Sequence, residues 1–286
     1  MFQYTIVQWL FFFYFYCFFG WCFESAYVSI KEKHFVNRGF MKGPFLPLYG
    51  SGAIMMLVVS KPFETNLVLV YLAGCVGATI LEYVTGVVME AIFRVRYWDY
   101  SNQKFQFQGH ICLSSSLTWG ALTILITRLI HPVVEAGVLA IPSMILSIVT
   151  YLLTAVLFAD FAISFKEALD MRDVLVKLEK AKEEIARLQK RLDVVIALTN
   201  EELSGRMDEF VEKTGGLAGT VEEAKAQLLA QMKEHMTTWE AKKTLLAEHI
   251  EKRMGLLFKH NPSMTSKRFE ELLEELKRRI VEHKGE

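Results

Sequence analysis

Acidic side chains interrupt three of the longest apolar stretches of this 286-residue chain. Glu24, Glu82, Glu90 and Asp160 each lie inside or near the end of a run that is otherwise almost uncharged. A charge at the centre of a bilayer costs on the order of 3 kcal/mol on insertion scales, so such residues usually face the interior of a helix bundle. There they take part in polar networks or in pathways for substrates and protons.

Glu82 is the most informative of the four carboxylates. Ala78, Glu82, Gly86 and Glu90 recur every four residues and therefore share one slowly drifting face of a helix. Small residues let helix backbones approach closely, and the same helix continues them at Ala73, Gly74 and Gly77. The pattern predicts an interior carboxylate at position 82. For Glu24, Glu90 and Asp160 the alternative is simple contact with headgroup water.

Two polar segments supply partners for these carboxylates. Residues 37–52 carry six Gly or Pro residues, too many for a plain helix. We expect part of this segment to dip into the bundle; an ordinary surface turn is the alternative. Residues 94–120 combine aromatic, acidic and hydroxyl side chains. The predicted polar site or pathway comprises Glu24, Arg38, Lys42, Glu82, Glu90, Trp98, Asp99, Tyr100, Asn102 and Trp119. His110 is either a proton relay or simply exposed.

Several kinds of chemistry are not indicated. The chain has no HExxH motif, no Ser/His/Asp set and no Cys/His spacing typical of a metal site, so we predict neither an enzyme nor a bound cofactor or metal. The four cysteines lie in or beside apolar runs and are expected to be small buried hydrophobes. The formal net charge of zero gives no indication of nucleic-acid binding.

Charge is distributed very unevenly along the chain. Residues 1–165 hold 9 of the 32 Lys/Arg and 8 of the 32 Asp/Glu, and residues 166–286 hold the other 23 and 24. The first part has apolar runs of membrane length and the second has none. We therefore predict an all-α protein, with a polytopic membrane helix bundle at 1–165 and a soluble helical tail at 166–286.

The chain has about five apolar runs that are long enough to cross about 30 Å of hydrocarbon. The predicted spans are Phe2–Ser29, Pro44–Ser60, Leu67–Phe93, Ile111–Ile130 and Val133–Phe165. The second is short and rich in Gly and Pro, so a re-entrant segment is the alternative there.

Basic residues are concentrated in the first and third connections between spans. These carry Lys31, Lys33, Arg38 and Lys42, and then Arg94, Arg96 and Lys104, against one basic residue in each of the other two connections. Because basic loops stay on the cytoplasmic side, this distribution predicts a cell-membrane protein with its N-terminus outside and its tail in the cytoplasm.

The tail shows a heptad pattern over residues 171–195. Apolar residues occupy one position at Met171, Leu178, Ile185 and Leu192, and another at Val174, Ala181, Leu188 and Val195. About four heptads indicate a coiled coil or a helical hairpin. The helices either pack within one chain or form a homodimer. Gly205 and Gly215–Gly216 mark breaks, and further helices are expected at 219–258 and 266–284.

Three stretches resemble the putative ABC-transporter type IV family of bacterial membrane proteins. They are NRGFMKGPFLPLYGSG (37–52), RYWDYSNQKFQFQGHICLSSSLTWG (96–120) and, in the tail, FKHNPSMTSKRF (258–269). The resemblance implies a transporter permease. Because the chain has no GxxxxGK[ST] loop for ATP, the resemblance also implies a separate ATPase subunit.

Three functions remain open on the sequence. A permease-like transporter component explains the intramembrane carboxylates and the segment rich in Gly and Pro. A membrane scaffold or sensor would use the helical tail to bind cytoplasmic partners. An intramembrane enzyme is the least supported.

Overall fold

The computed structural model describes residues 4–200 and 218–282, and these are almost entirely helical. The chain divides into two compact units, one of residues 1–172 with 254–273, the other of 173–253 with 274–286. The first unit holds the apolar helices and the second the charged ones.

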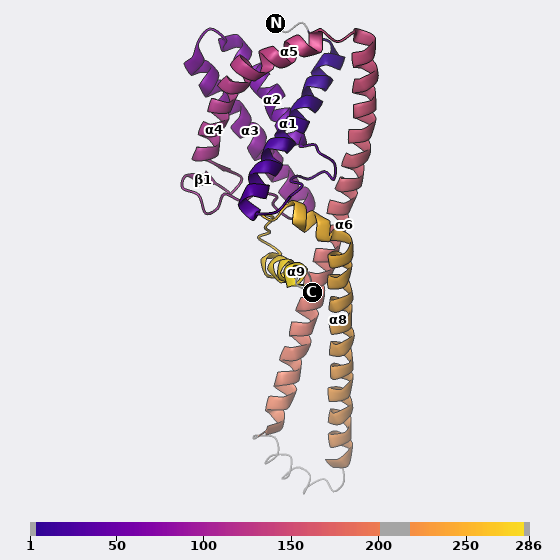
Figure 1. The fold of residues 1–286 in the computed structure, drawn as a ribbon. Coiled ribbons are helices and arrows are strands. Elements are labelled where there is room, and N and C mark those ends of the chain that lie inside the picture. Colours follow the sequence, from indigo (N-terminus) through magenta and orange to yellow (C-terminus); the bar gives the residue numbers. More distant parts are fainter. Residues whose placement is uncertain (1–3, 201–217, 283–286) are drawn as a thin grey trace. The chain divides into compact units, whose positions relative to one another are not determined.

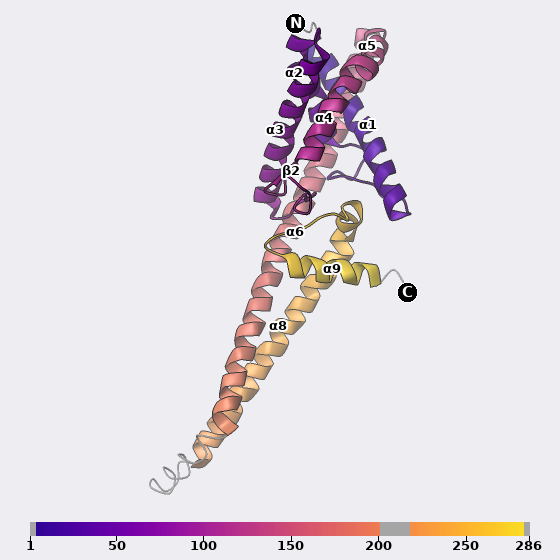
Figure 2. The same ribbon diagram turned by 90° about the vertical axis from the view of Figure 1, so that its left-hand side faces the viewer.

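Within residues 4–200 and 218–282, four helical stretches are long and apolar enough to cross a membrane. They are α1 (Ile6–Glu32), α3 (Leu67–Phe93), the stretch Leu113–Leu139 and the first part of α6 (Ser143–Asn200). Figures 1 and 2 show these helices gathered in one bundle. The predicted membrane bundle is therefore confirmed, and α3 has the bounds that the sequence predicted.

The second predicted span has an unusual form. Its helix α2 covers only Pro47–Ser60 and is followed by the turn η1 (Lys61–Phe63). Its 14 residues rise about 21 Å, less than the hydrocarbon core. Residues 33–46 lead to it without helical structure, and the Leu46 N–H donates to the Cys17 carbonyl at 3.0 Å, midway along α1. Irregular backbone thus enters the bundle, as predicted, with its polar groups bonded to protein.

The boundary predicted between the fourth and fifth spans is wrong. The helix continues from α4 (Leu113–Leu125) through the π turn η2 (Ile126–Ile130) into α5 (His131–Leu139), and the chain breaks only at residues 140–142. Pro132 stands in the first turn of α5, directly after the π turn. A proline at such a position loses little, because its missing N–H has no required partner there.

Neighbouring helices of the bundle pack through small residues. α1 packs on α2, α2 on α3 and α3 on α4. An added Cβ at Gly74 of α3 would lie 2.1 Å from the Thr123 hydroxyl of α4, and one at Gly50 of α2 would lie 2.4 Å from the Cys17 sulfur. Gly74, Ala78 and Glu82 are all buried, so the predicted stripe of α3 does face the interior.

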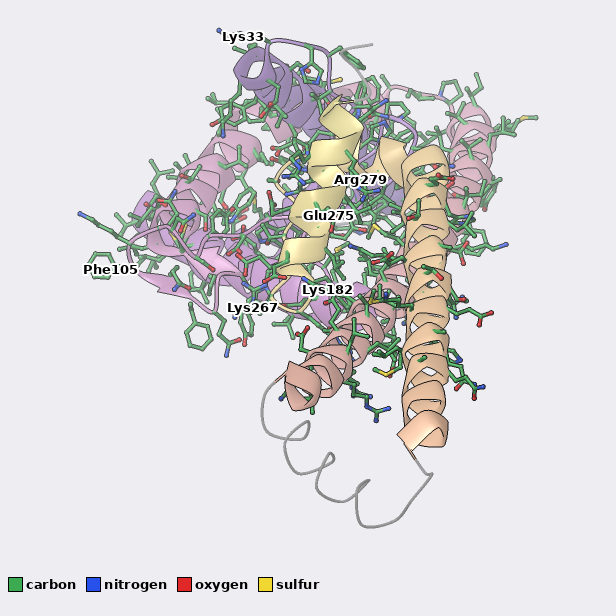
Figure 3. All side chains as sticks on the ribbon, turned by 90° about the horizontal axis from the view of Figure 1, so that it is seen from below. Lys33, Phe105, Lys182, Lys267, Glu275 and Arg279 are labelled. Carbon is green, nitrogen blue, oxygen red and sulfur yellow. The ribbon has the colours of Figure 1, made fainter. Side chains whose placement is uncertain are left out.

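The first and third connections meet at one end of the bundle. Arg38 donates to the Tyr97 carbonyl at 3.2 Å, which joins residues 33–46 to residues 94–112. The third connection contains a short antiparallel hairpin whose strands have two residues each, β1 (Gln106–Phe107) and β2 (Ile111–Cys112). Gln106 pairs with Cys112, and Phe107 with Ile111. Figure 3 looks onto this end, with Lys33 and Phe105 at its edge. We call it the basic end; the side of the membrane that it faces stays a prediction.

The second connection and the break at residues 140–142 lie at the opposite end of the bundle (Figure 1). There the guanidinium of Arg128, in η2, donates to the Glu64 carbonyl of the second connection. Basic connections therefore alternate with nearly uncharged ones along the chain, as the positive-inside pattern requires.

In the second unit, the distal part of α6 and α8 (Ala218–His260) run alongside each other in opposite directions (Figures 1 and 2). Leu178 and Ala181 of α6 are buried, as are Ala247 and Ile250 of α8. In α9 (Glu270–Glu282), Glu275 pairs with Lys243 at 3.6 Å. These contacts match the intramolecular alternative; a coiled coil over 171–195 and a homodimer stay predictions. The predicted breaks at Gly205 and Gly215–Gly216 lie outside the described residues.

Candidate functional site

The Glu82 carboxylate is buried inside the bundle and is held by three neutral donors. Its residue is 4% exposed. The Tyr100 hydroxyl donates to Oε1 at 3.0 Å, and the Trp119 indole N–H and Ser115 hydroxyl donate to Oε2 at 2.9 Å and 3.3 Å. No basic side chain forms an ion pair with Glu82 in the described part of the chain. We call these four residues the Glu82 cluster.

Local structure explains how the three donors converge. Ser115 and Trp119 lie one turn apart on α4, and the start of that helix is capped by Cys112. Tyr100 comes from the third connection, where its N–H donates to the Gly109 carbonyl at 2.9 Å. Gly109 has a φ of +77°, which favours glycine. Burial and then Glu82 raise the pKa of Tyr100, so its hydroxyl is a neutral donor.

A cavity of about 740 Å³ lies beside this cluster. Glu82, Tyr49 and Trp119 line it, and almost all of its other walls are apolar side chains of α1, α2, α3 and α4. A volume of this size is typical of small-molecule sites, in which a few polar groups orient a mostly apolar ligand. The arrangement can therefore hold a compound at a buried carboxylate.

Glu24 and Arg38 form a second polar group next to the cavity. The Tyr49 hydroxyl donates to Glu24 at 2.6 Å, and Arg38 lies 3.5 Å from the same carboxylate. The Tyr49 and Trp119 rings are 6.2 Å apart in an edge-to-face arrangement. This aromatic contact joins Glu24 and Arg38 to the Glu82 cluster.

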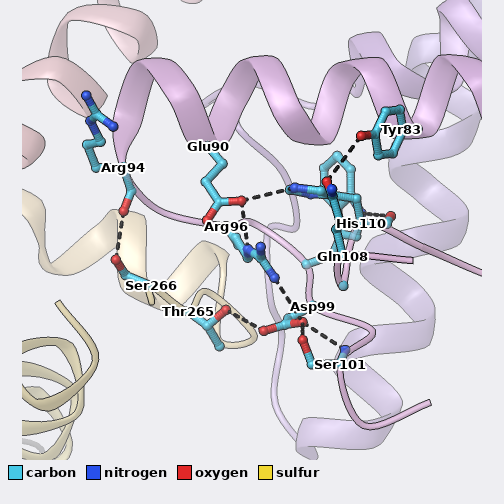
Figure 4. Close-up of polar contacts among 12 residues, drawn as sticks. Tyr83, Glu90, Arg94, Arg96, Asp99, Ser101, Gln108, His110, Thr265 and Ser266 are labelled. Carbon is cyan, nitrogen blue, oxygen red and sulfur yellow. Dashed lines mark hydrogen bonds and ion pairs between the residues drawn. The ribbon is translucent and has the colours of Figure 1, made fainter. Parts of the chain in front are cut away.

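Glu90, Arg96, Asp99 and His110 form a third group, the Arg96 cluster (Figure 4). Arg96 is 4% exposed and lies 2.9 Å from Glu90 and 3.5 Å from Asp99, while His110 lies 3.0 Å from Glu90. Burial opposes ionisation of Asp99, but hydrogen bonds from Ser101 and the Arg96 charge outweigh it and hold the pKa of Asp99 below its ordinary range. Burial and then Arg96 lower the pKa of His110, although Glu90 acts in the opposite direction.

A segment of the tail is bound to these clusters. We call residues 257–269 the docked segment. Arg38 donates to the Asn261 side-chain carbonyl at 3.0 Å and to the Ser263 hydroxyl at 2.9 Å. Arg96 and Thr265 exchange both backbone hydrogen bonds, at 2.7 Å and 2.9 Å. The apolar side chains Phe258, Met264 and Phe269 of the segment are buried.

Further contacts strengthen this attachment. The Thr265 hydroxyl donates to Asp99 at 3.1 Å, and the Ser266 hydroxyl donates to the Arg94 carbonyl at 2.7 Å (Figure 4). Asn261 is 1% exposed and donates to the Gly39 carbonyl at 3.0 Å. Residues 258–269 are one of the three stretches on which the resemblance in the sequence rests, but the sequence does not predict their partners in the bundle.

Most of the predicted site residues fall into these groups, but two do not. Trp98 supports the Arg96 cluster by donating to the His110 carbonyl at 3.0 Å. Lys42 instead pairs with Glu167, and its N–H donates to Asp160 at 3.2 Å. Asn102 is exposed in the third connection and joins none of these clusters, so a role for it in the site stays a prediction. An asparagine amide is a common binding group, but at an exposed turn position water can satisfy its hydrogen bonds.

His110 is buried rather than exposed, at 4%. The simple alternative for this residue, an exposed loop histidine, was therefore wrong. His110 is paired with Glu90 at 3.0 Å, and proton transfer through His110 stays a prediction.

A polar group at the opposite end was missed. His131 is 4% exposed, and its two ring nitrogens lie 3.3 Å from the Tyr4 hydroxyl and 3.0 Å from the Tyr16 hydroxyl. Tyr4 also donates to Glu135, and a cavity of about 510 Å³ borders this group. The signal in the sequence is a histidine inside an almost unbroken apolar stretch. The connection predicted between the fourth and fifth spans falls at this point, and His131 was therefore assigned no site.

Metal binding has no geometric support in residues 4–200 and 218–282. No group of three or more His, Cys, Asp or Glu side chains there has a spacing that could hold an ion. The chemistry on offer is hydrogen bonding and charge pairing.

Comparison with known proteins identifies a family. The model of a family described as "Putative ABC-transporter type IV" matches residues 11–165, more than half of the chain. No curated protein and no solved structure matches the chain. The matched range contains the Glu82 and Arg96 clusters with the apolar helices that position them, and the chain is therefore a membrane protein of the putative ABC-transporter type IV family.

Proposed function

We propose that this protein is a permease-like component of a membrane transporter, and that its substrate path passes the Glu82 cluster. The observation that carries the proposal is the Glu82 carboxylate, buried beside a cavity of about 740 Å³ without a basic partner among the described residues. Carboxylates within membrane helices are costly and mark pathways and binding sites. The family description supports the same function.

In this proposal the chain itself catalyses no chemical reaction. It contains no GxxxxGK[ST] motif, so nucleotide hydrolysis would come from a separate ATPase subunit. The loop charges support a cell-membrane location with the basic end and the tail in the cytoplasm. A membrane-impermeant thiol reagent tests this orientation. On intact cells it should leave single cysteines at Lys42 and Lys104 unmodified, and labelling of either one contradicts the orientation.

The transport function can be tested before the substrate is known. Cells lacking the protein would be complemented with the wild type, Glu82→Gln or Glu64→Gln, and the compounds in cells and medium compared by mass spectrometry. Glu64 is an exposed carboxylate paired with Lys61. Glu64→Gln therefore makes the same chemical change as Glu82→Gln, but away from the cavity beside Glu82. We expect wild type and Glu64→Gln to restore the distribution of compounds and Glu82→Gln to leave it altered. Full restoration by Glu82→Gln would contradict the proposal.

A sensor or scaffold is the second candidate, and the docked segment is the observation that favours it. Bonds from Arg38 to Asn261 and from Arg96 to Thr265 tie residues 257–269 to the first and third connections. In that case, deletion of residues 174–253 would abolish function in the same complementation, whereas Glu82→Gln would not. The opposite pattern supports the permease.

A further inference from the structure

The cavity beside Glu82 has a composition suited to one class of ligand. Its lining residues are apolar apart from Glu82 and a few hydroxyl and thiol groups, and aromatic rings are prominent among them. Tyr49 and Trp119 stand next to the carboxylate, and Tyr16, Phe19 and Phe23 line the wall formed by α1. Aromatic faces attract cations through their quadrupole, most strongly where water is excluded.

The charge of the site has the same implication. Both Glu82 oxygens accept hydrogen bonds from neutral donors only. No basic side chain among the described residues balances the charge of this carboxylate. Arg38 is already paired with Glu24, and Arg96 with Glu90. A positively charged ligand would supply what the protein does not, because a desolvated carboxylate is strongly stabilised by an opposite charge within a few ångströms.

The cavity borders surfaces that face lipid. Phe19 and Phe23 of α1 are 54% and 68% exposed, and Leu125 of α4 is 41% exposed, yet all three line the cavity. Exposed apolar side chains on a membrane helix contact hydrocarbon, so an apolar compound dissolved in the bilayer can reach the cavity beside them. A small hydrophilic ion would find almost no polar wall there.

We propose that the cavity binds lipophilic organic cations, with the positive charge next to Glu82 and the apolar part against the aromatic walls of α1, α2 and α4. The proposal rests on the proposed function and names its substrate class. It differs from simple lipid occupancy, because acyl chains alone gain nothing from a carboxylate.

A binding measurement on the full chain in lipid nanodiscs tests the proposal. The probe is radiolabelled tetraphenylphosphonium, and triphenylphosphine oxide is its uncharged counterpart. We expect saturable binding of the cation only, an affinity lower by about tenfold or more in Glu82→Gln, and a change of less than about twofold in Glu64→Gln. Equal binding of the neutral probe, or wild-type affinity in Glu82→Gln, would overturn the proposal.

The wild-type protein offers a second measurement that does not depend on how the variant folds. Cys22 lines the cavity, whereas Cys75 contacts Gly120 on the packed face between α3 and α4. Saturating tetraphenylphosphonium should slow alkylation of Cys22 by N-ethylmaleimide by about tenfold and leave that of Cys75 unchanged. No protection of Cys22, or equal protection of both, contradicts the proposal.

The two proposals fail in different ways. If Glu82→Gln cells remain defective but the cation does not bind, the permease stands and the ligand class is wrong. If the cation binds but Glu82→Gln restores the cells fully, the cavity is a cation site without a transport function.

Discussion

Removal of the Asn261 side chain should release the docked segment from the bundle. Asn261 is 1% exposed and makes two hydrogen bonds to the bundle, donating to the Gly39 carbonyl at 3.0 Å and accepting from Arg38 at 3.0 Å. Its third bond, to the Leu257 carbonyl at 3.1 Å, lies within the segment itself. A neutral hydrogen bond contributes about 0.5–1.5 kcal/mol net, and one to a charged group about 1.5–3 kcal/mol. Asn261→Ala should therefore lower the stability of docking by about 2–4.5 kcal/mol.

Hydrogen exchange of the full protein in nanodiscs measures this change. Each 1.4 kcal/mol is a factor of ten, so backbone amides of residues 257–269 should exchange about 25-fold faster or more in Asn261→Ala. Amides of α3 should keep their wild-type rates. Lys259→Ala, an exposed change in the same segment, is the matched control and should have little effect. Exchange in Asn261→Ala within about threefold of the wild-type rate would show that the bonds to Gly39 and Arg38 do not hold the segment.

Three further predictions follow from contacts within the same unit. Gly74→Ala would place a Cβ 2.1 Å from the buried Thr123 hydroxyl and should lower the free energy of unfolding by about 1–3 kcal/mol, seen as a lower thermal midpoint. Gly52→Ala, where nothing lies within 4 Å, should leave the midpoint unchanged. Arg38→Lys keeps the charge but loses the planar fork of donors, so residues 257–269 should exchange about tenfold faster, and an unchanged rate would show that charge alone suffices. Burial and then nearby lysines lower the pKa of His260, so docking should be fully stable above about pH 6.5 and weaken as the pH falls below it. Exchange corrected for its intrinsic pH dependence should show this loss in the wild type and not in His260→Gln.

Hydropathy and spacing were sufficient to predict the membrane class and the third span. The reason is that insertion depends on the summed transfer free energy of about twenty consecutive side chains, which the sequence contains directly. The four-residue spacing through Glu82 predicted an interior carboxylate for the same kind of reason, because helix geometry assigns residues to faces. The breakers around Gly43 and Pro44 likewise predicted irregular backbone inside the bundle, which the Leu46–Cys17 bond confirms.

Partner choice was decided only by the tertiary structure. The end of the fourth helical stretch depends on whether Pro132 breaks a helix or begins a new turn, and the π turn before it favours the second outcome. Lys42 and Asn102 have the same residue types as members of the clusters, yet Lys42 pairs with Glu167 and Asn102 faces water. The docked segment reaches Arg38 across more than two hundred residues. Sequence thus determined which segments must leave water, because that is a local sum; which polar groups meet depends on distances between helices that no local pattern contains.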